Sequence, residues 1–143
     1  MFVETTYLGK VEIQADDILT FANGIPGFKD EKEYVLLPFG KEGFFLLQSA
    51  VTKHHAFICV NPFIFWANYE IRLDDQSIEQ LNLSNETDVA IFVLLTIEQP
   101  FTLSTANLKA PIVTNTKNGK AKQLMLQTSH YSAKTPLVTK GGS

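Results

Sequence analysis

The feature that most constrains the fold is the dipeptide Asn118-Gly119, which separates two strand-like runs, residues 103–113 and 121–126. An Asn-Gly pair between β-rich runs predicts a hairpin, because both central residues of a type I′ turn need a positive φ angle. Pro111 has no backbone N–H to donate, so its strand is expected to begin there, to lie at a sheet edge or to contain a bulge. We expect this hairpin to close a β-sheet.

Short strand-like runs fill most of the remaining chain, and about eight to ten strands are expected, with no alternation of strand and helix. Only residues 75–82 predict a helix, in which Asp75 would be the N-cap and Ile78 and Leu81 would face the core. This pattern predicts an all-β fold: an antiparallel β-barrel or sandwich-like single domain with one short helix at about residues 75–82.

The 143 residues are enough for one domain, which we place at residues 1–130. Residues 131–143 show weak patterning and are expected to form a weakly structured tail. The N-terminus has neither the basic region nor the apolar stretch of a secretory signal, and no apolar run approaches the ~20 residues of a membrane span. These features predict a cytoplasmic protein with no membrane partner.

Charge is unevenly distributed along the chain, whose net charge is −3. All 15 acidic residues lie at or before Glu98 together with six basic residues, a balance of −9. The part after Glu98 has six lysines and no acidic residue, a balance of +6. Lysines can protect exposed strand edges, or the charged regions can bind partners, and the sequence leaves both interpretations open.

The side chains that could carry catalysis or bind a metal do not form a recognised pattern. His54 and His55 precede the single cysteine, Cys59, at a spacing that would point the ligands to both faces of a strand. The pair Asp74-Asp75 could imitate a carboxylate dyad, but helix capping explains it more simply. The sequence contains no nucleophile elbow and no glycine-rich phosphate loop. It therefore predicts no enzyme, no cofactor and no metal site.

A small β-barrel could also bind single-stranded RNA or DNA through a basic groove and stacking aromatic rings. The candidate basic residues are Lys109, Lys117, Lys120 and Lys122. No aromatic residue lies among them, and the net charge of −3 opposes the phosphate contacts that dominate such binding. Direct nucleic-acid binding is therefore not expected, and a small RNA-binding β-barrel remains only as an alternative.

Several segments resemble, in order and over almost the whole chain, the segments of one known family. They are YLGKVEI at residues 7–13, ILTF at 18–21, GIPGF at 24–28, NPF at 61–63, YE at 69–70, LDD at 73–75 and TANLKAPIV at 105–113. Each segment alone is weakly specific, whereas together they are specific. Through these segments the chain resembles the FliW family, the bacterial flagellar assembly factors.

The resemblance implies a non-enzymatic cytoplasmic protein with an antiparallel, barrel-like β fold. It also implies two protein partners, flagellin and the RNA-binding translational repressor CsrA. In that family, free FliW binds CsrA away from its RNA site and antagonises it, until accumulating flagellin sequesters FliW and releases CsrA. We therefore expect a partner switch that controls flagellin synthesis, with this chain a monomer when free. The alternative is a dedicated flagellin chaperone without a regulatory arm.

The residues suggest one surface for each partner. CsrA must attract phosphate, so an acidic surface could dock near its RNA-binding region and repel RNA over about a Debye length, ~8 Å at physiological salt. Captured flagellin would expose apolar helix surface, which an aromatic cluster would suit. A purely structural role competes with both assignments. The predicted CsrA-binding residues are Glu70, Asp74, Asp75, Glu79, Glu86 and Asp88, and the predicted flagellin-binding residues are Phe63, Phe65, Trp66 and Tyr69.

Overall fold

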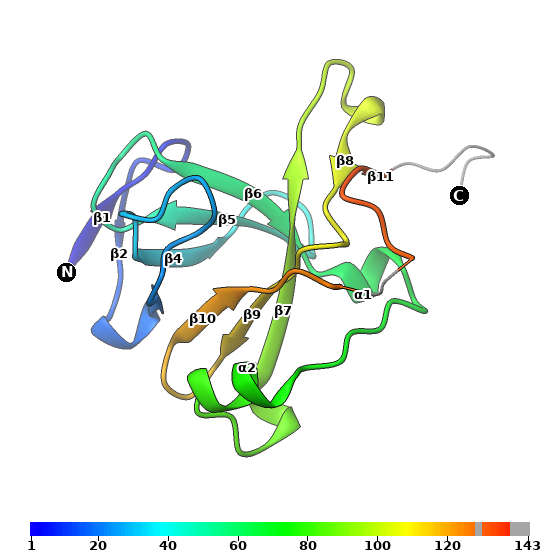
Figure 1. The fold of residues 1–143 in the computed structure, drawn as a ribbon. Coiled ribbons are helices and arrows are strands. Elements are labelled where there is room, and N and C mark those ends of the chain that lie inside the picture. Colours follow the sequence, from blue (N-terminus) through cyan, green and yellow to red (C-terminus); the bar gives the residue numbers. More distant parts are fainter. Residues whose placement is uncertain (128–129, 138–143) are drawn as a thin grey trace.

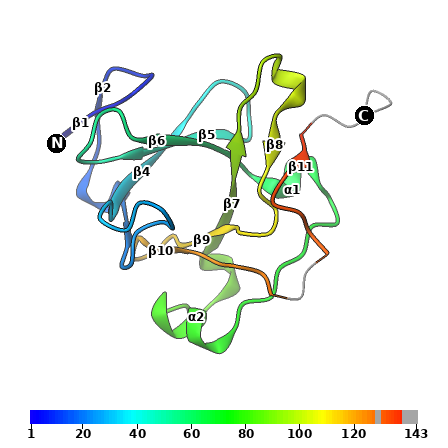
Figure 2. The ribbon, with the colours of Figure 1, turned by 45° about the horizontal axis from the view of Figure 1, so that its top comes forward.

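The strands of the computed structural model, which describes residues 1–127 and 130–137, form a closed barrel (Figures 1 and 2). The order around the barrel is β7-β6-β5-β4-β3-β10-β9, and β9 pairs again with β7, which closes these seven strands into a ring. The predicted all-β barrel is confirmed. The barrel strands are β3 (Ile18–Phe21), β4 (Glu33–Pro38), β5 (Phe44–Ser49), β6 (Ala56–Val60), β7 (Val89–Thr96), β9 (Ile112–Asn115) and β10 (Lys120–Gln123).

Two short additions flank the barrel. β1 (Phe2–Glu4) and β2 (Lys10–Glu12) form a separate hairpin, which is followed by the 3₁₀ turn η1 (Ala15–Asp17). β8 (Thr105–Ala106) and β11 (Thr135–Pro136) extend the sheet from β7.

One pairing in the barrel departs from the predicted antiparallel arrangement. β10 pairs with β3 in parallel, with Lys120 opposite Thr20 and Ala121 opposite Phe21. This pairing brings the C-terminal hairpin against a strand from the start of the chain. Such a long-range pairing has no local sequence signal.

The expectation of a single helix is also wrong, because a second helix, α1 (Pro62–Phe65), follows β6. The side chain of Asn61 caps this helix by accepting the N–H of Phe63 at 3.0 Å. Pro62, at the first helical position, has no N–H that would need a partner. The same Asn-Pro pair therefore ends β6 and starts α1.

The hairpin predicted around Asn118-Gly119 is confirmed, since β9 and β10 pair in antiparallel register and join β7 to β3. The turn is longer than type I′. Of its two central residues only Gly119 has a positive φ angle, of 76°, and its N–H donates to the carbonyl of Asn115 at 2.9 Å. β9 begins directly after Pro111, as the missing N–H predicts.

The predicted helix is α2 (Asp75–Gln80), which is shorter than expected at its C-terminal end. Its N-cap is Asp74 and not the following residue, because the Asp74 carboxylate accepts the N–H of Ser77 at 3.2 Å. The helix turns Ser77 and Leu81 toward the core, one turn apart, whereas Ile78 is 37 % exposed. The prediction that Ile78 is buried is therefore wrong.

The C-terminal part differs from the expected weakly structured tail over residues 131–137. β11 pairs with β8, Leu137 is buried, and its N–H donates to the carbonyl of Ser104 at 3.1 Å. Paired backbone and an apolar side chain thus hold this part on the barrel. The rest of the predicted tail, residues 138–143, lies outside the described residues.

The core has two main parts. One, inside the barrel, includes Phe21, Tyr34, Leu47, Cys59 and Ile112, and the other, beside α1 and β11, includes Val60, Tyr69, Val93, Leu108 and Leu137. Burial raises the pKa of the Cys59 thiol, so this cysteine is a small core residue, as the sequence predicts. None of the helices within residues 1–127 and 130–137 is long and apolar enough to cross a membrane.

Candidate partner-binding surfaces

The acidic residues predicted to bind CsrA lie along the chain between α1 and β7, through α2 and the 3₁₀ turn η2 (Glu86–Asp88). We call residues 70–88 the acidic stretch. In Figures 1 and 2 its helix α2 lies beside the hairpin of β9 and β10. Five of the six carboxylates are on exposed residues, and only Asp88 is half-buried.

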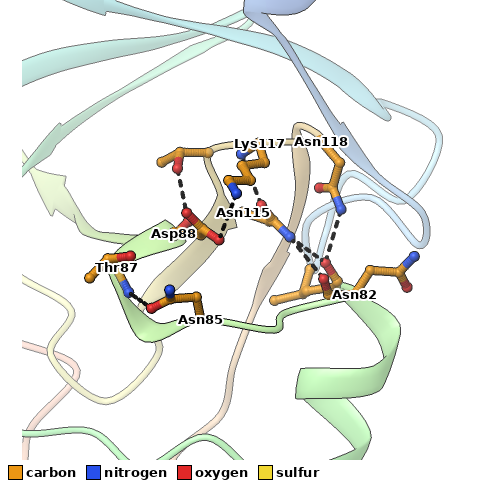
Figure 3. A network of polar contacts seen from close by, with 9 residues as sticks. Asn82, Asn85, Thr87, Asp88, Asn115, Lys117 and Asn118 are labelled. Atoms are coloured by element: carbon orange, nitrogen blue, oxygen red, sulfur yellow. Dashed lines mark hydrogen bonds and ion pairs between the residues drawn. The ribbon is translucent and has the colours of Figure 1, made fainter.

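A network of polar side chains fixes the acidic stretch to the hairpin (Figure 3). Asn115, which is 3 % exposed, donates through Nδ2 to the carbonyl of Leu81 at 2.8 Å and to that of Asn82 at 3.2 Å. Asn118 also donates to the carbonyl of Leu81, at 3.2 Å. These carbonyls lie at the end of α2, where a helix has no partners for its last C=O groups. Sequence reasoning missed that these asparagines hold α2, because asparagines in or near an Asn-Gly turn are typical of the turn itself.

The lysines of the hairpin lie among the acidic residues and not on a separate edge. Lys122 Nζ donates to Ser77 Oγ at 3.2 Å and to Gln80 Oε1 at 2.6 Å. Lys117 forms an ion pair with Asp88, with 3.8 Å between Nζ and Oδ2. The separation of charge along the sequence is therefore not a separation in space, and two of the four lysines considered for RNA binding are engaged with the acidic stretch.

Hydrogen bonds from Ser77 lower the pKa of Asp74 below its ordinary value, and the positive charge of Lys122 acts in the same direction. Asp74 therefore stays ionised at neutral pH, caps α2 and is partly balanced by Lys122. Within the acidic stretch, the carboxylates that form no hydrogen bond or ion pair with described residues are those of Glu70, Asp75, Glu79 and Glu86.

The aromatic residues predicted to bind flagellin differ in exposure. Phe63 is 44 % exposed, Phe65 and Trp66 are half-buried, and Tyr69 is buried. The Tyr69 hydroxyl donates to the carbonyl of Leu108 at 2.8 Å, inside the second part of the core. The structure therefore brings Phe63 to the surface and gives Tyr69 a structural role.

Two exposed apolar residues that sequence reasoning missed extend this surface. Ile64 is 53 % exposed on α1, and Phe101, in the 3₁₀ turn η3 (Phe101–Leu103), is 44 % exposed. The ring of Phe44 connects the two elements, because its centroid lies 5.5 Å from that of Phe65 and 6.4 Å from that of Phe101. Only the fold brings residues of η3 and α1 to the same ring, that of Phe44. We call Phe63, Ile64, Phe65 and Phe101 the α1–η3 patch.

A groove of about 600 Å³ separates residues 70–77 from residues 122–127 and 130–131. It borders the acidic stretch on one side and the continuation of β10 on the other. Its lining is mixed: apolar side chains come from Ile71, Leu73, Leu124 and Met125, and charged ones from Glu70, Arg72, Asp74 and Lys122.

The histidines and the cysteine weighed as metal ligands have other surroundings. Nε2 of His55 lies 2.7 Å from the hydroxyl of Tyr34, while Cys59 is fully buried in the barrel. Burial, with the nearby charge of Glu31, raises the pKa of Tyr34 to about 12, so this hydroxyl keeps its proton. In the part of the chain that the structure describes, no three His, Cys, Asp or Glu side chains come together as metal ligands.

Comparison with known proteins identifies the family. A family model described as "FliW protein" matches residues 2–137, which include β11. The flagellar assembly factor FliW of Shouchella clausii is 51 % identical over 142 residues, covering 99 % of this chain and 97 % of that protein. The flagellar assembly factor FliW of Bacillus subtilis is 45 % identical over 138 residues, covering 96 % of each protein.

A solved structure agrees with these sequence relatives. It is a crystal structure of the flagellar assembly factor FliW, which matches this fold with a TM-score of 0.93 at 42 % identity and covers 99 % of each chain. The resemblance noted in the sequence segments is confirmed. This chain belongs to the FliW family, whose named members are flagellar assembly factors.

Proposed function

We propose that this protein acts in flagellar assembly as a non-enzymatic cytoplasmic regulator that switches between two protein partners. As a free monomer it binds CsrA through the acidic stretch and antagonises it allosterically, and flagellin sequesters it through the α1–η3 patch. The observation that carries the proposal is that a FliW family member presents two exposed surfaces of different chemistry on different elements. The acidic one suits a basic partner, and the apolar one suits a partner with an apolar helix face.

The acidic stretch suits a protein that must itself attract phosphate. An RNA-binding repressor carries positive charge near its RNA surface, because phosphate contacts dominate RNA affinity. Exposed carboxylates that are not balanced by lysine, such as those of Asp75, Glu79 and Glu86, would attract that surface. Once docked, their field would repel RNA over ~8 Å at physiological salt. In this proposal, the protein antagonises the repressor without binding nucleic acid itself.

Reversing two charges on α2, Asp75→Lys with Glu79→Lys, is expected to weaken CsrA binding roughly tenfold or more, because attractive contacts become repulsive. Neither carboxylate forms a hydrogen bond or ion pair within the described residues, so α2 keeps its cap at Asp74. Isothermal titration calorimetry measures the change, which should shrink as the salt concentration rises.

The matched control reverses Glu4 and Glu12, two exposed acidic residues on the β1–β2 hairpin. This control has the same net charge as the α2 variant and should bind CsrA like the unmodified protein. Equal affinity of both variants would remove the acidic stretch as the CsrA surface.

The α1–η3 patch suits flagellin because it exposes apolar side chains from two elements that both contact the ring of Phe44. Three of its four residues are at least 44 % exposed. Contiguous exposed apolar residues mark binding surfaces for protein partners, and an amphipathic helix places its apolar face on such a surface. The proposed ligand is therefore an apolar helix face of unassembled flagellin.

Truncating the patch at Phe63 and Ile64, both to alanine, is expected to weaken flagellin binding roughly tenfold or more, since buried aromatic and apolar anchors carry much of the energy of such interfaces. CsrA affinity should not change. The measurement is biolayer interferometry with each partner. The control is Val51→Ala, which truncates a 76 % exposed apolar residue on another turn. A correctly folded variant that binds flagellin normally would exclude the patch.

The partner switch itself is tested by size-exclusion chromatography with light scattering. The protein is mixed with CsrA, and flagellin is then added. A CsrA complex that flagellin dissolves supports the switch. Binding to flagellin alone would instead identify a dedicated flagellin chaperone without a regulatory arm. Binding to neither protein would contradict the switch and favour the alternative of a small RNA-binding β-barrel.

A further inference from the structure

The groove between residues 70–77 and residues 122–127 and 130–131 is bordered on the β10 side by the extended segment at residues 124–126. Leu124 and Leu126 donate their N–H groups to the carbonyls of Pro111 and Lys109, both at 2.9 Å. Successive residues of an extended chain direct their N–H and C=O groups to opposite sides, so those of Met125 point away from this pairing. Met125 lines the groove, and no hydrogen bond reaches its backbone within the described part of the chain.

Strand β3, which lies next to β10 in the barrel, does not cover the edge at Met125. The parallel pairing of β3 with β10 includes only Lys120 and Ala121, and β3 ends at Phe21. Residues 124–126 therefore continue the edge of β10 past the end of β3, at the groove that Met125 lines. Open edges with unpaired backbone groups are templates for another strand.

The opposite wall is the extended segment between α1 and α2, which belongs to no sheet (Figure 1). Its side chains alternate: Glu70, Arg72 and Asp74 are exposed, whereas Ile71 and Leu73 are half-buried against the core. This alternation is typical of a β-strand. The backbone groups of residues 71–73 form no hydrogen bond among the described residues. Met125 on one wall and residues 71–73 on the other thus have backbone groups with no hydrogen-bond partner among the described residues.

We propose that this groove binds an extended segment of a partner protein, which adds to the fold as a further β-strand between the two walls. Backbone groups of the inserted strand pair with those of Met125 and of residues 71–73. Apolar side chains on one face of the strand cover Leu124, which supplies an apolar lining. This inference goes beyond the proposed function, because it depends on neither CsrA nor flagellin.

Charges on the wall specify the side chains of the inserted strand. Glu70 and Arg72 lie two residues apart on the same face, and neither side chain forms an ion pair within the described residues. A strand antiparallel to this wall places an acidic residue opposite Arg72 and, two residues later, a basic residue opposite Glu70. The residue between them faces the lining and is apolar. The ligand pattern is acidic–apolar–basic.

The first test uses the unmodified protein and a fluorescein-labelled peptide, Thr-Val-Asp-Val-Lys-Val-Thr. Fluorescence anisotropy should show binding that is several-fold tighter than for the same peptide with Asp and Lys exchanged. A peptide with the original order but with N-methyl groups on alternate residues should bind roughly tenfold more weakly or worse, because it lacks the backbone donors. No binding, equal binding of the three peptides, or a preference for the exchanged order overturns the proposal.

The second test uses protein variants and hydrogen exchange. The double exchange Glu70→Arg with Arg72→Glu should reverse the preference between the two charge orders. Met125→Pro, which removes an N–H that the fold does not use, should weaken binding, whereas Met125→Ala should not. The Met125 amide should become protected from exchange when peptide is added. Protection without peptide, in a dimer that forms at high concentration, would assign the groove to a second copy of the chain and overturn the proposal.

Discussion

Replacing Gln48 with leucine is expected to lower the free energy of unfolding by about 3 kcal/mol or more, because the turn that contacts this buried amide loses several hydrogen bonds at once. Gln48 lies on β5 and is 0 % exposed. Its Oε1 accepts the N–H of Thr6 at 2.8 Å. Its Nε2 lies 3.0–3.2 Å from four carbonyls of residues 49–55, so this amide organises the whole turn between β5 and β6.

Urea denaturation followed by circular dichroism measures this loss. The control is Gln76→Leu, an exposed glutamine of α2 with no side-chain hydrogen bond among the described residues. The control should stay within about 0.5 kcal/mol of the unmodified protein. A Gln48→Leu variant as stable as the control would show that the buried amide does not hold the turn.

Replacing Asn115 with alanine is expected to lower the free energy of unfolding by about 2 kcal/mol, since this buried side chain donates to the carbonyls of both Leu81 and Asn82 and so joins α2 to the hairpin. The Asn115 Oδ1 also accepts the N–H of Lys117 at 2.9 Å, so the same change loosens the turn of the hairpin. The variant should also loosen α2 locally. Relative to the unmodified protein, hydrogen exchange should accelerate more at the amides of α2 than at those of the β4–β5 pair, because Asn115 joins α2 to the barrel.

The matched control for this prediction is Asn118→Ala. Asn118 donates to the same carbonyl of Leu81, but it is exposed and its bond is longer, at 3.2 Å. Its loss should cost less than about 1 kcal/mol, because water can replace an exposed donor. If the two variants are equally stable, burial of Asn115 does not decide the attachment of α2. If the acidic stretch binds CsrA, Asn115→Ala should also weaken that binding, and Asn118→Ala should not.

The barrel was predictable where local signals govern the chain. The turn residues Asn118 and Gly119 and the missing N–H of Pro111 act on their own backbone, so they predicted the hairpin and the start of β9. The parallel seam between β3 and β10 was not predictable, because it joins segments from the two ends of the chain. Helix α2 was placed almost correctly, but two adjacent aspartates made its cap ambiguous by one residue.

The candidate surfaces were predictable in composition and not in arrangement. The sequence identified acidic residues around α2, and the structure shows most of them exposed. It could not show that Lys117 and Lys122 lie among them, because the hairpin and α2 meet only in the fold. The aromatic cluster was read as one unit, yet Tyr69 packs inward while Phe63 faces solvent.

By itself the sequence determined the class of fold, the closing hairpin, the presence of a short helix near residues 75–82 and the family. Each depends on short-range chemistry: φ preferences, alternation of apolar residues, capping side chains and runs of characteristic residues. Only the tertiary structure decided which side chains are exposed, which charges are balanced and which strand edges stay open. These properties depend on residues far apart in the chain, because burial, ion pairing and strand pairing are settled by the neighbours that folding brings together.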